Sequence, residues 1–501
     1  MLEGLEISEI KLSELERTSR IDSEFYKKEN LAIQFLLKNT KSLPLTEYVT
    51  VSDGNHMSIS DNFSETGVPY YRGQDIHDFF IENANPICIP KSIFDLGTMQ
   101  RSHLKKHDVL MSIVGTIGEI SIVTTDANAT CSCKLAILRP KKNVSAEVIA
   151  LYLQSKYGQN QIRKFIRGAV QMGFILEDIN QIFVPAFSKD FQSKIETLVK
   201  SAHAKLEKSK SLYAQAENLL LCELGMSGEN LSEFSKPCGG ANVSIKRFSD
   251  VFQSGRLDSE YYQKKYDLIE EKISHLETLK ISEIGKLNDK NFSPEENAEY
   301  KYIELADIGT QGEISSCTLA KGSELPTRAR RIVHKGDVLV SSIEGSLQSC
   351  AIVPSEFDGA LCSTGFYVIE PKTMNAETLL ILLKSENIQL LLKKGCSGTI
   401  LTNISKEEFL KIRIPVLSTE IQSKIASLVR SSFSCRAESR QLLQNAKTLV
   451  EQEIEKQGEE IDEKKVAQIN AVYDKVSEKE QISMSRSSMR SMWEAVKDDT
   501  W

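Results

Sequence analysis

The sequence predicts an α+β protein: two tandem mixed α/β globules, separated by two long helices that pack as an antiparallel coiled coil. Three observations lead to this prediction. Short motifs recur in the same order in both halves of the chain, each half contains short β-branched runs broken by Gly, Asp, Asn and Pro, and each half ends in a long stretch with neither Pro nor Gly.

The composition is that of a globular protein too large for one core. The chain has 501 residues, of which 41% are hydrophobic and 26% charged, so we expect two or three domains. It contains no apolar run of the ~18 residues that a membrane span needs, and its start, "MLEGLEISEIKLSELE", is acidic where a signal peptide is basic. We therefore expect a cytoplasmic protein without a membrane partner.

Charge and cysteine content exclude further classes. The net charge of −7 argues against a protein that coats nucleic acid without specificity. The ten cysteines are scattered, and only Cys131 and Cys133 are close together. A single C-x-C without a second ligand pair is a weak metal signal, and small buried side chains in a reducing compartment account for it better. The sequence predicts no metal site and no disulfide.

The repeats begin with a heptapeptide. "RIDSEFY" starts at Arg20 and "RLDSEYY" at Arg256, 236 positions later. In mid-half, "DVLMSIVG" from Asp108 returns as "DVLVSSIEG" from Asp337. Chance can supply one such match but not an ordered series, so the chain is a tandem duplication.

Two further landmarks close each half. Gly168 and Gly398 each lie 17 residues before a proline, and "QSKI" follows seven residues after that proline, from Gln192 and from Gln422. Between the landmarks the halves diverge, as "YYRGQDIHDFF" and "YIELADIGTQG" illustrate. The sequence thus predicts a shared frame that carries different surfaces.

Within each half, β-branched runs such as "VLMSIVG" and "DVLVSSI" predict strands, at about 40–187 and 278–417. Two helical stretches, "SAEVIALYLQSKYG" and "NAETLLILLKSENI", begin at Ser145 and Asn375, which are good N-cap residues. Each half is therefore expected to be a mixed α and β globule.

The long stretches that contain each "QSKI" have apolar residues at spacings of three and four, for example Ile195, Val199 and Ala202, and Ile421, Ile425 and Leu428. Each predicts a helix of roughly 35 residues, or about 50 Å. Because neither helix can bury its apolar stripe alone, we expect them to pack on each other in antiparallel fashion. Packing of each helix on its own globule could account for part of the length.

The end of the chain, residues 458–501, has no counterpart in the first half. It is charged, rich in Ser and Met, and contains the only two tryptophans, Trp493 and Trp501. A frayed tail is the expected structure. A docking peptide built around the tryptophans is the alternative.

These landmarks, in this order and twice over, resemble the specificity subunit of type I restriction-modification systems, across nearly the whole chain. The phrase "IRIPVLSTEIQSKI" of the second half fits the family pattern I-P-x-L followed by Gln and Ile, whereas "IFVPAFSKDFQSKI" has Phe187 in place of leucine. The resemblance implies target-recognition domain 1 at 1–187, conserved spacer helix 1 at 188–235, target-recognition domain 2 at 236–417, conserved spacer helix 2 at 418–457 and a tail at 458–501.

The resemblance also implies function and partners. Each recognition domain would read one half of a split site in double-stranded DNA, and the helices would hold the two readers apart. The chain would recruit two methyltransferase subunits and a restriction and translocation subunit. S-adenosylmethionine, ATP and Mg²⁺ would be bound by those partner subunits and no cofactor by this chain.

Candidate DNA-contacting residues are cations and amide or hydroxyl side chains near glycine turns, since such groups position phosphates and read base edges. Those of the first half are Arg72, Gln74, Arg101, Lys105, Lys106, Thr116, Arg163, Lys164, Arg167 and Gln171. Those of the second half are Arg328, Arg330, Arg331, Lys335, Ser346, Gln348, Lys393, Lys394, Ser397 and Thr399. For any one of them a solvated surface role is about as plausible. The glycine turns at 168–173 and 395–398 rank highest.

The chain has no catalytic signature. It lacks the Asn-Pro-Pro-aromatic motif of adenine methyltransferases and a G-x-x-x-x-G-K-[ST] loop for ATP, and "VGTIGEI" at 114–120 is an incomplete G-x-G-x-x-G. We therefore expect no enzymatic activity of its own. Three alternatives stay open: the recognition subunit of a type II or other phage-defence methyltransferase, a coiled-coil adaptor that binds no DNA, and a stand-alone nuclease.

Overall fold

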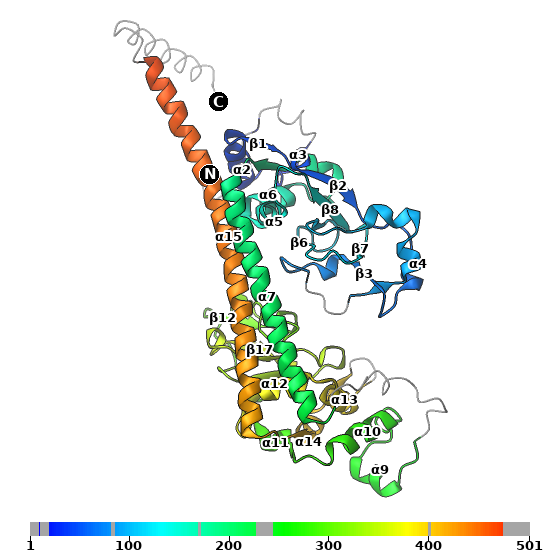
Figure 1. Cartoon of the computed structure of the whole chain (residues 1–501). Helices are drawn as coiled ribbons and strands as arrows, with labels where there is room; N and C mark the ends of the chain where they lie inside the picture. Colours follow the sequence, from blue (N-terminus) through cyan, green and yellow to red (C-terminus); the bar gives the residue numbers. More distant parts are fainter. Residues whose placement is uncertain are drawn as a thin grey trace. The chain divides into compact units, whose positions relative to one another are not determined.

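The computed structural model describes residues 10, 20–81, 86–168, 172–226, 244–398 and 402–473. The chain divides into two compact units, and each is described by itself below. Unit 1 comprises residues 1–203 and 439–501, and unit 2 comprises residues 204–438. Each unit holds one of the predicted globules together with part of both long helices (Figure 1).

The first globule interleaves short strands with helices. Its helices are α2 (Lys28–Asn39), α3 (Leu45–Tyr48), α4 (Lys91–Phe94), α5 (Ala146–Gln154) and α6 (Lys156–Lys164). Its strands are β1 (Ser42–Pro44), β2 (Val49–Asp53), β3 (Val68–Tyr71), β4 (Cys88–Ile89), β5 (Val109–Ser112), β6 (Ile120–Ile122), β7 (Thr130–Cys131), β8 (Leu135–Pro140) and β9 (Phe183–Pro185). The long helix α7 (Lys189–Glu223) follows.

The second globule repeats this order. Its helices are α9 (Phe248–Ser254), α10 (Lys264–Ile273), α11 (Ile281–Ile284), α12 (Ala376–Lys384), α13 (Glu386–Lys394) and α14 (Lys406–Lys411). Its strands are β10 (Thr278–Lys280), β11 (Gly285–Leu287), β12 (Glu299–Ile303), β13 (Thr318–Lys321), β14 (Ala329–Ile332), β15 (Val338–Ser341), β16 (Cys350–Ile352), β17 (Leu361–Ser363), β18 (Phe366–Pro371), β19 (Cys396–Ser397), β20 (Asn403–Ile404) and β21 (Arg413–Pro415). The long helix α15 (Thr419–Tyr473) follows.

The duplication is visible in the sheets. A four-stranded sheet has the order β2-β8-β5-β6 in unit 1 and β11-β18-β15-β16 in unit 2. A second sheet pairs β3 with β7 in parallel, as β12 pairs with β17. All four residues of β5 and of β15 are buried, because these strands lie between two neighbours and carry side chains that pack on both faces. The mixed α and β prediction is confirmed for both halves.

The "QSKI" repeat has a structural explanation. Ser145 caps α5 and Asn375 caps α12, as predicted, each accepting a hydrogen bond from a backbone N–H three residues on. The glutamine of each "QSKI" accepts a hydrogen bond from the backbone N–H of that cap residue, at 3.0 Å for Gln192 and 3.2 Å for Gln422. Both glutamines thereby tie the start of a long helix to the globule before it.

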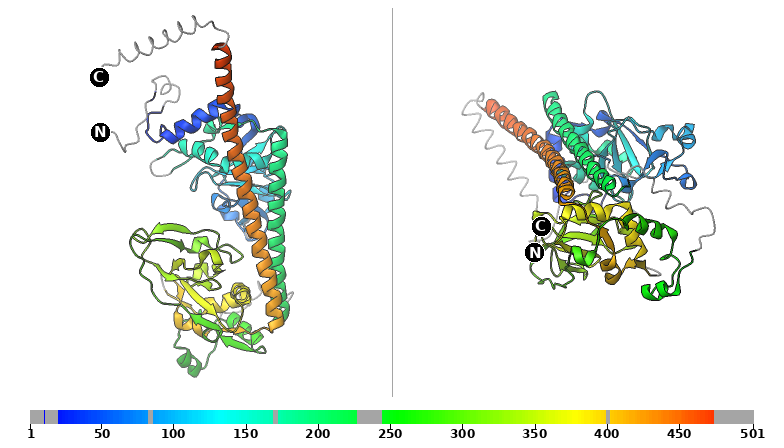
Figure 2. Two further views of the ribbon diagram at one scale, coloured as in Figure 1. Left: turned by 90° about the vertical axis from the view of Figure 1, so that its left-hand side faces the viewer. Right: turned by 60° about the horizontal axis from the view of Figure 1, so that its bottom comes forward.

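The two long helices contact each other within each unit. In unit 2 the Ser209 and Ser432 hydroxyls lie 2.9 Å apart, and Lys205 pairs with Glu438. In unit 1 the Ser439 hydroxyl donates to the carbonyl of Ala202. Within unit 2, residue numbers fall on α7 as they rise on α15, from the Ser209–Ser432 contact to the Lys205–Glu438 contact, so these segments run antiparallel (Figure 2).

Helix α15 continues beyond residue 457, where the sequence led us to place the start of a tail. Gly458, the first residue of the predicted tail, lies within the helix. A Cβ at this position would lie 2.4 Å from Cδ1 of Leu36 on α2, so the absence of a side chain lets Leu36 pack closely against α15. The helix runs to Tyr473, and both tryptophans lie outside the described residues.

The two globules contact the long helices through different chemistry. In unit 1 the ring of Phe80 packs on His203 of α7 at 4.8 Å. In unit 2 Arg436 of α15 forms an ion pair with Glu313 at 3.2 Å, with side chains only 6% and 10% exposed, and also donates to Gln311. Gly309 leaves room for this carboxylate, since a Cβ there would lie 2.3 Å from it.

Replacing Arg436 by alanine is expected to destabilise unit 2 by about 3–5 kcal/mol, because it leaves the Glu313 carboxylate buried without its cation. Urea unfolding of the full chain, with hydrogen exchange of α12 amides as the report on unit 2, measures this. The matched control is Arg430→Ala on the same helix, whose partner is Glu377. Its side chain is 68% exposed, and its loss should cost under about 1 kcal/mol. Equal effects of the two variants would contradict the prediction.

Candidate nucleic-acid interface

In unit 1, several loops meet beyond the carboxyl end of β5. The backbone N–H of Ile113 donates to the carbonyl of Lys134 at 3.0 Å, and that of Phe174 donates to the carbonyl of Ile113 at 2.9 Å. The loop after β3 also lies here, because a Cβ built on Gly73 would be 3.6 Å from the carbonyl oxygen of Val114. We call residues 72–75, 113–118, 132–134, 167–168 and 172–174 the first loop edge.

Unit 2 has the matching arrangement beyond β15. The backbone N–H of Ser342 donates to Gly365, that of Ile404 donates to Ser342 and that of Glu344 donates to Thr402, at 2.9 to 3.0 Å. Arg328 joins them through its own carbonyl, which accepts from the N–H of Thr364 at 2.9 Å. We call residues 328, 342–348, 363–365, 396–398 and 402–404 the second loop edge.

Each edge contains a hairpin that opens with a glycine. Gly168 has φ +114° and Gly398 has φ +138°, a left-handed region that side chains other than glycine rarely enter. Before these glycines, Arg167 exchanges backbone hydrogen bonds with Gly173, and Ser397 pairs with Asn403. The glycine turns that ranked highest in the sequence therefore begin matching hairpins in the two units. Gln171 and Thr399 lie outside the described residues.

The first loop edge collects several predicted residues. The side chains of Gln74 and Thr116 are exposed. Arg72 lies on the edge and forms an ion pair with Asp75, three residues on, in which its Nε is 3.2 Å from the carboxylate. Arg167 forms an ion pair with Asp178 at 2.8 Å. Arg163, on α6 just before the hairpin, is exposed, and no side-chain partner is recorded for it among the described residues.

The second loop edge collects a different set. Arg328 donates to the hydroxyl of Tyr302 at 3.3 Å and to Glu304 at 2.9 Å, and these bonds raise the pKa of its guanidinium. Ser346 shares a hydrogen bond with Ser341, and Lys393 lies 3.5 Å from Glu344. The side chains of Gln348 and Ser397 are exposed.

The structure places the other predicted residues elsewhere. Lys105 and Lys106 precede β5, and Lys335 precedes β15, so they lie at the strand ends opposite the loop edges. Arg101 is paired with Asp53, Arg330 donates to the carbonyl of Thr327, and Arg331 donates to that of Asn288. The remaining two, Lys164 and Lys394, end α6 and α13 with their ammonium groups over aromatic rings.

Sequence reasoning missed Lys134. It is exposed on the turn between β7 and β8, and its carbonyl accepts the hydrogen bond from Ile113 that closes the first loop edge. In the sequence it is a single lysine in "CSCKLAIL" and lies near no other cation, so only the strand pairing reveals its place.

No metal site emerges in the described part of the chain, where no three His, Cys, Asp or Glu side chains are grouped as ligands. Cys131 is fully buried, and burial raises the pKa of its thiol. Among the described helices, none is both long and apolar enough to cross a bilayer.

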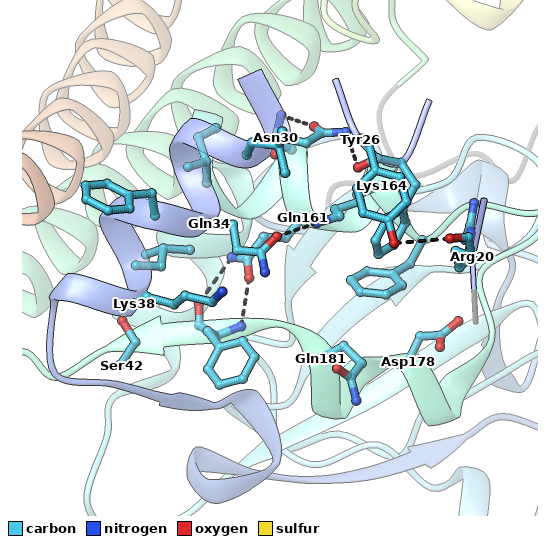
Figure 3. Close-up of a pocket in the computed structure, with 18 of the residues that line it drawn as sticks. Arg20, Tyr26, Asn30, Gln34, Lys38, Ser42, Gln161, Lys164, Asp178 and Gln181 are labelled. Carbon is cyan, nitrogen blue, oxygen red and sulfur yellow. Dashed lines mark hydrogen bonds between the residues drawn. The ribbon is translucent and has the colours of Figure 1, made fainter. Parts of the chain in front are cut away.

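A cavity of about 780 Å³ lies in unit 1, between α2, α6 and β9. Figure 3 shows Arg20, Tyr26, Lys164 and Asp178 at one end of it and Lys38 and Ser42 at the other. The first heptapeptide thus lines this cavity, next to the helix that leads into the hairpin of the first loop edge.

Residues 273–445 match the family model described as the type I restriction modification DNA specificity domain. This part of the chain is therefore similar to the DNA specificity domain of that family. The first half repeats its sheet order and its loop edge. The resemblance recognised in the sequence is therefore confirmed.

Individual relatives agree with this assignment. The specificity subunit of the type I restriction enzyme EcoBI from Escherichia coli is 28% identical over 155 residues, which make up 31% of this chain and 32% of that protein. The matched stretch therefore spans about a third of that relative.

Solved structures of low identity also match. The S subunit of a type I restriction-modification system from M. genitalium is 14% identical, over 83% of this chain and 95% of that one, with a TM-score of 0.38. The HsdS subunit from Thermoanaerobacter tengcongensis is 15% identical, over 84% and 96%, with a TM-score of 0.27.

One aspartate of the shared frame occurs in both halves but has different partners in them. Asp108, before β5, accepts two hydrogen bonds of 2.7 Å from Arg139. The corresponding Asp337, before β15, accepts one from the backbone of His334, and Glu370 occupies the place of Arg139. Burial, above all, raises the pKa of the Asp337 carboxyl.

Because the folded state raises the pKa of Asp337, its contribution to stability is greatest when it is protonated and is lost as the pH rises through that pKa. The contribution of Asp337 to the stability of unit 2 should therefore rise as the pH falls from neutral toward about 4. Asp337→Asn should remove this gain and leave stability at pH 7 unchanged or higher. Asp108→Asn should instead destabilise unit 1 by about 1.5–3 kcal/mol, since it weakens a charge-assisted pair.

Urea unfolding at several pH values, with exchange of β5 and β15 amides reporting the two units, tests both variants. A loss of stability at pH 7 in Asp337→Asn as large as that in Asp108→Asn would contradict this account of the pair.

Proposed function

We propose that the chain is the DNA sequence-recognition subunit of a type I restriction-modification complex. Each half would read one half of a split target in double-stranded DNA with its loop edge. The match of residues 273–445 to the DNA specificity domain supports this proposal, as does the repeated frame of the first half.

The main support for the proposal is that the two halves share their backbone fold but differ in the side chains at their loop edges. The strands, caps and glycine turns repeat, whereas the side chains on the edges do not. Arg167 of the first edge corresponds to Ser397 of the second. Arg72 and Gln74 of the first edge correspond to Glu304 and Ala306, which adjoin the second edge through the ion pair of Glu304 with Arg328. A duplicated protein with one ligand would have kept both edges alike. Two edges of different charge and hydrogen-bonding capacity fit two different half-sites, since bases are read by side-chain donors and acceptors.

In this proposal α7 and α15 pair as an antiparallel coiled coil that sets the distance between the two half-sites. The 35 residues of α7 give about 50 Å at 1.5 Å per residue. That length corresponds to about 15 base pairs, which would place the two readers more than one helical turn apart.

The chemistry would belong to partner subunits. Two methyltransferase subunits would bind S-adenosylmethionine and flip an adenine in each half-site, and a restriction and translocation subunit would use ATP and Mg²⁺. The sequence lacks motifs for either reaction, which supports a non-catalytic role for this chain. Partner contacts to DNA make a net charge of −7 acceptable.

Methylation mapping tests the proposal directly. The chain is co-expressed with the methyltransferase encoded beside it, in a host free of DNA methylation, and N6-methyladenine is mapped by single-molecule sequencing. We expect a split, asymmetric motif that is lost when this chain is omitted. An assembled complex that methylates an unbroken motif, or none, would contradict the proposal.

A surface variant tests the first loop edge. Arg163→Ala should weaken binding of the assembled complex to its target by about tenfold, because an exposed cation close to the hairpin is removed. Lys142→Ala is the matched control. Lys142 is equally exposed but follows β8 at the end that pairs with the start of β5, away from the edge. Fluorescence anisotropy at several salt concentrations measures both variants. Equal losses in the two variants would count against the assignment of the edge.

A further inference from the structure

The repeated heptapeptide folds into the same cluster of side chains in both units. In unit 1 the guanidinium of Arg20 makes two hydrogen bonds to Asp22, at 2.6 and 2.9 Å, and lies 4.7 Å from the centre of the Phe25 ring. The ammonium of Lys164 lies 4.1 Å from the centre of the same ring. The hydroxyl of Tyr26 donates to the carbonyl of Arg20. One aromatic ring thus holds two cations, one from the heptapeptide and one from the end of α6.

Unit 2 repeats each contact with its own residues. Arg256 makes the two hydrogen bonds to Asp258, at 2.6 and 3.1 Å, and lies 4.8 Å from the centre of the Tyr261 ring. Lys394, the last residue of α13, lies 5.0 Å from that centre. The hydroxyl of Tyr262 donates to the carbonyl of Arg256 at 2.8 Å.

Both clusters adjoin the hairpins of the loop edges. Lys164 and Lys394 each stand four residues before the glycine of positive φ, Gly168 or Gly398. In unit 2 the contact is direct, because Arg256 also donates to the carbonyl of Cys396, the first residue of β19, at 3.0 Å. The heptapeptide therefore lies against the point at which the helix ends and the hairpin begins.

The arginines are poorly suited to contact DNA themselves. Their side chains are only 17% and 15% exposed, and each is bound through two nitrogens to the aspartate two residues on. This pairing lowers the pKa of Asp22 and of Asp258, so both remain ionised partners at neutral pH. In addition, a motif that is nearly identical in both halves cannot distinguish two different half-sites. Its role must be common to the two readers.

We propose that Arg20 with Phe25 and Lys164, and Arg256 with Tyr261 and Lys394, are positioning residues that fix the hairpin of each loop edge for reading DNA. The inference rests on the proposed function and extends it to residues that lie outside 273–445, the stretch matched by the DNA specificity domain, apart from Lys394. It also explains why the chain carries the heptapeptide twice, since each hairpin needs its own support.

Hydrogen exchange of the full chain, assembled with its methyltransferase, tests the positioning role without any assumption about DNA. Arg256→Ala should speed exchange of the backbone amides of Glu344 and Ile404, whose hydrogen bonds link the second hairpin to the loop after β15, by about tenfold. Exchange at Arg167 and Gly173 of the first hairpin should not change. Arg20→Ala should give the reverse result. The amides of α5 and α12 serve as internal standards for global unfolding.

Ring substitutions provide matched controls and a second set of variants. Phe25→Tyr and Tyr261→Phe give each unit a ring that the other copy already uses, so they should behave as the wild type. Phe25→Leu and Tyr261→Leu remove the ring that holds both cations, and each should loosen its own hairpin. These variants decide the question if an arginine variant does not fold.

The functional readout is discrimination between bases. Methylation by the assembled complex is measured on target duplexes with single base changes in either half-site. Arg20→Ala and Arg256→Ala should each lower discrimination by about tenfold in one half-site only, and in opposite halves. A structural role alone would lower methylation of all duplexes together.

Unchanged hairpin exchange in both arginine variants, or equal acceleration of hairpin and α12 amides, would overturn the proposal, and so would equal loss of discrimination in both half-sites. Absence of split methylation by the wild-type complex would instead refute the proposed function, while the exchange data would still decide whether the heptapeptide positions the hairpin.

Discussion

The complete burial of one short strand in each unit, β5 and β15, is the constraint on which the rest of the structure depends. Each is bonded on both edges, by β8 and β6 or by β18 and β16, and all four of its residues are buried. A strand held in this way has no freedom to shift register without exposing its side chains. The loops that leave its carboxyl end therefore start from a fixed position, and the hairpin after α6 or α13 bonds back to them.

This frame allows the surface to change while the fold does not. Partly exposed side chains at or beside the loop edges contribute less to stability than buried ones, so Arg72 in one half and Glu304 in the other are both compatible with the same strands. Contacts with the long helices have diverged as well. Phe80 on His203 is an aromatic contact, whereas Glu313 with Arg436 is a buried ion pair. If the first globule were packed against the part of α15 that carries Arg436, this arginine would be buried without the carboxylate that Glu313 supplies in unit 2.

Much of the fold follows from the sequence. The caps at Ser145 and Asn375 and the two long helices are local signals, since each depends on residues within a few positions of each other, and the duplication is visible in the ordered repeat of short motifs. The length of α15 was not predicted, because the sequence indicates a tail that begins at Gly458, whereas this glycine lies within the helix and packs against Leu36, more than 400 residues away in the chain. Their unpaired apolar stripes predicted that the helices pack on each other, and in unit 2 Ser209 contacts Ser432 and Lys205 pairs with Glu438.

The candidate site was predictable only in part. The glycine turns were found because a backbone position with positive φ favours glycine, which can be recognised in the sequence. In the structure both turns begin matching hairpins. The ion-pair partner of each cation could not be recognised in the sequence. Arg101 is paired with Asp53 and Arg328 with Glu304, across 48 and 24 positions, so a basic patch in the sequence is partly neutralised in the fold. Lys105, Lys106 and Lys335 precede their strands, and strand direction places them at the ends opposite the edges.

Photo-cross-linking tests the central claim, that two equivalent edges read two different half-sites, most directly. A photoreactive amino acid replaces either Thr116, which is exposed on the first loop edge, or Ser346, which is partly exposed on the second. The variant is studied in the complex assembled with its methyltransferase and bound to its target duplex. The account predicts that each position cross-links to bases of one half-site, and that the two half-sites differ. Cross-links from both positions to the same half-site, or no more cross-linking than from position 142, would contradict it.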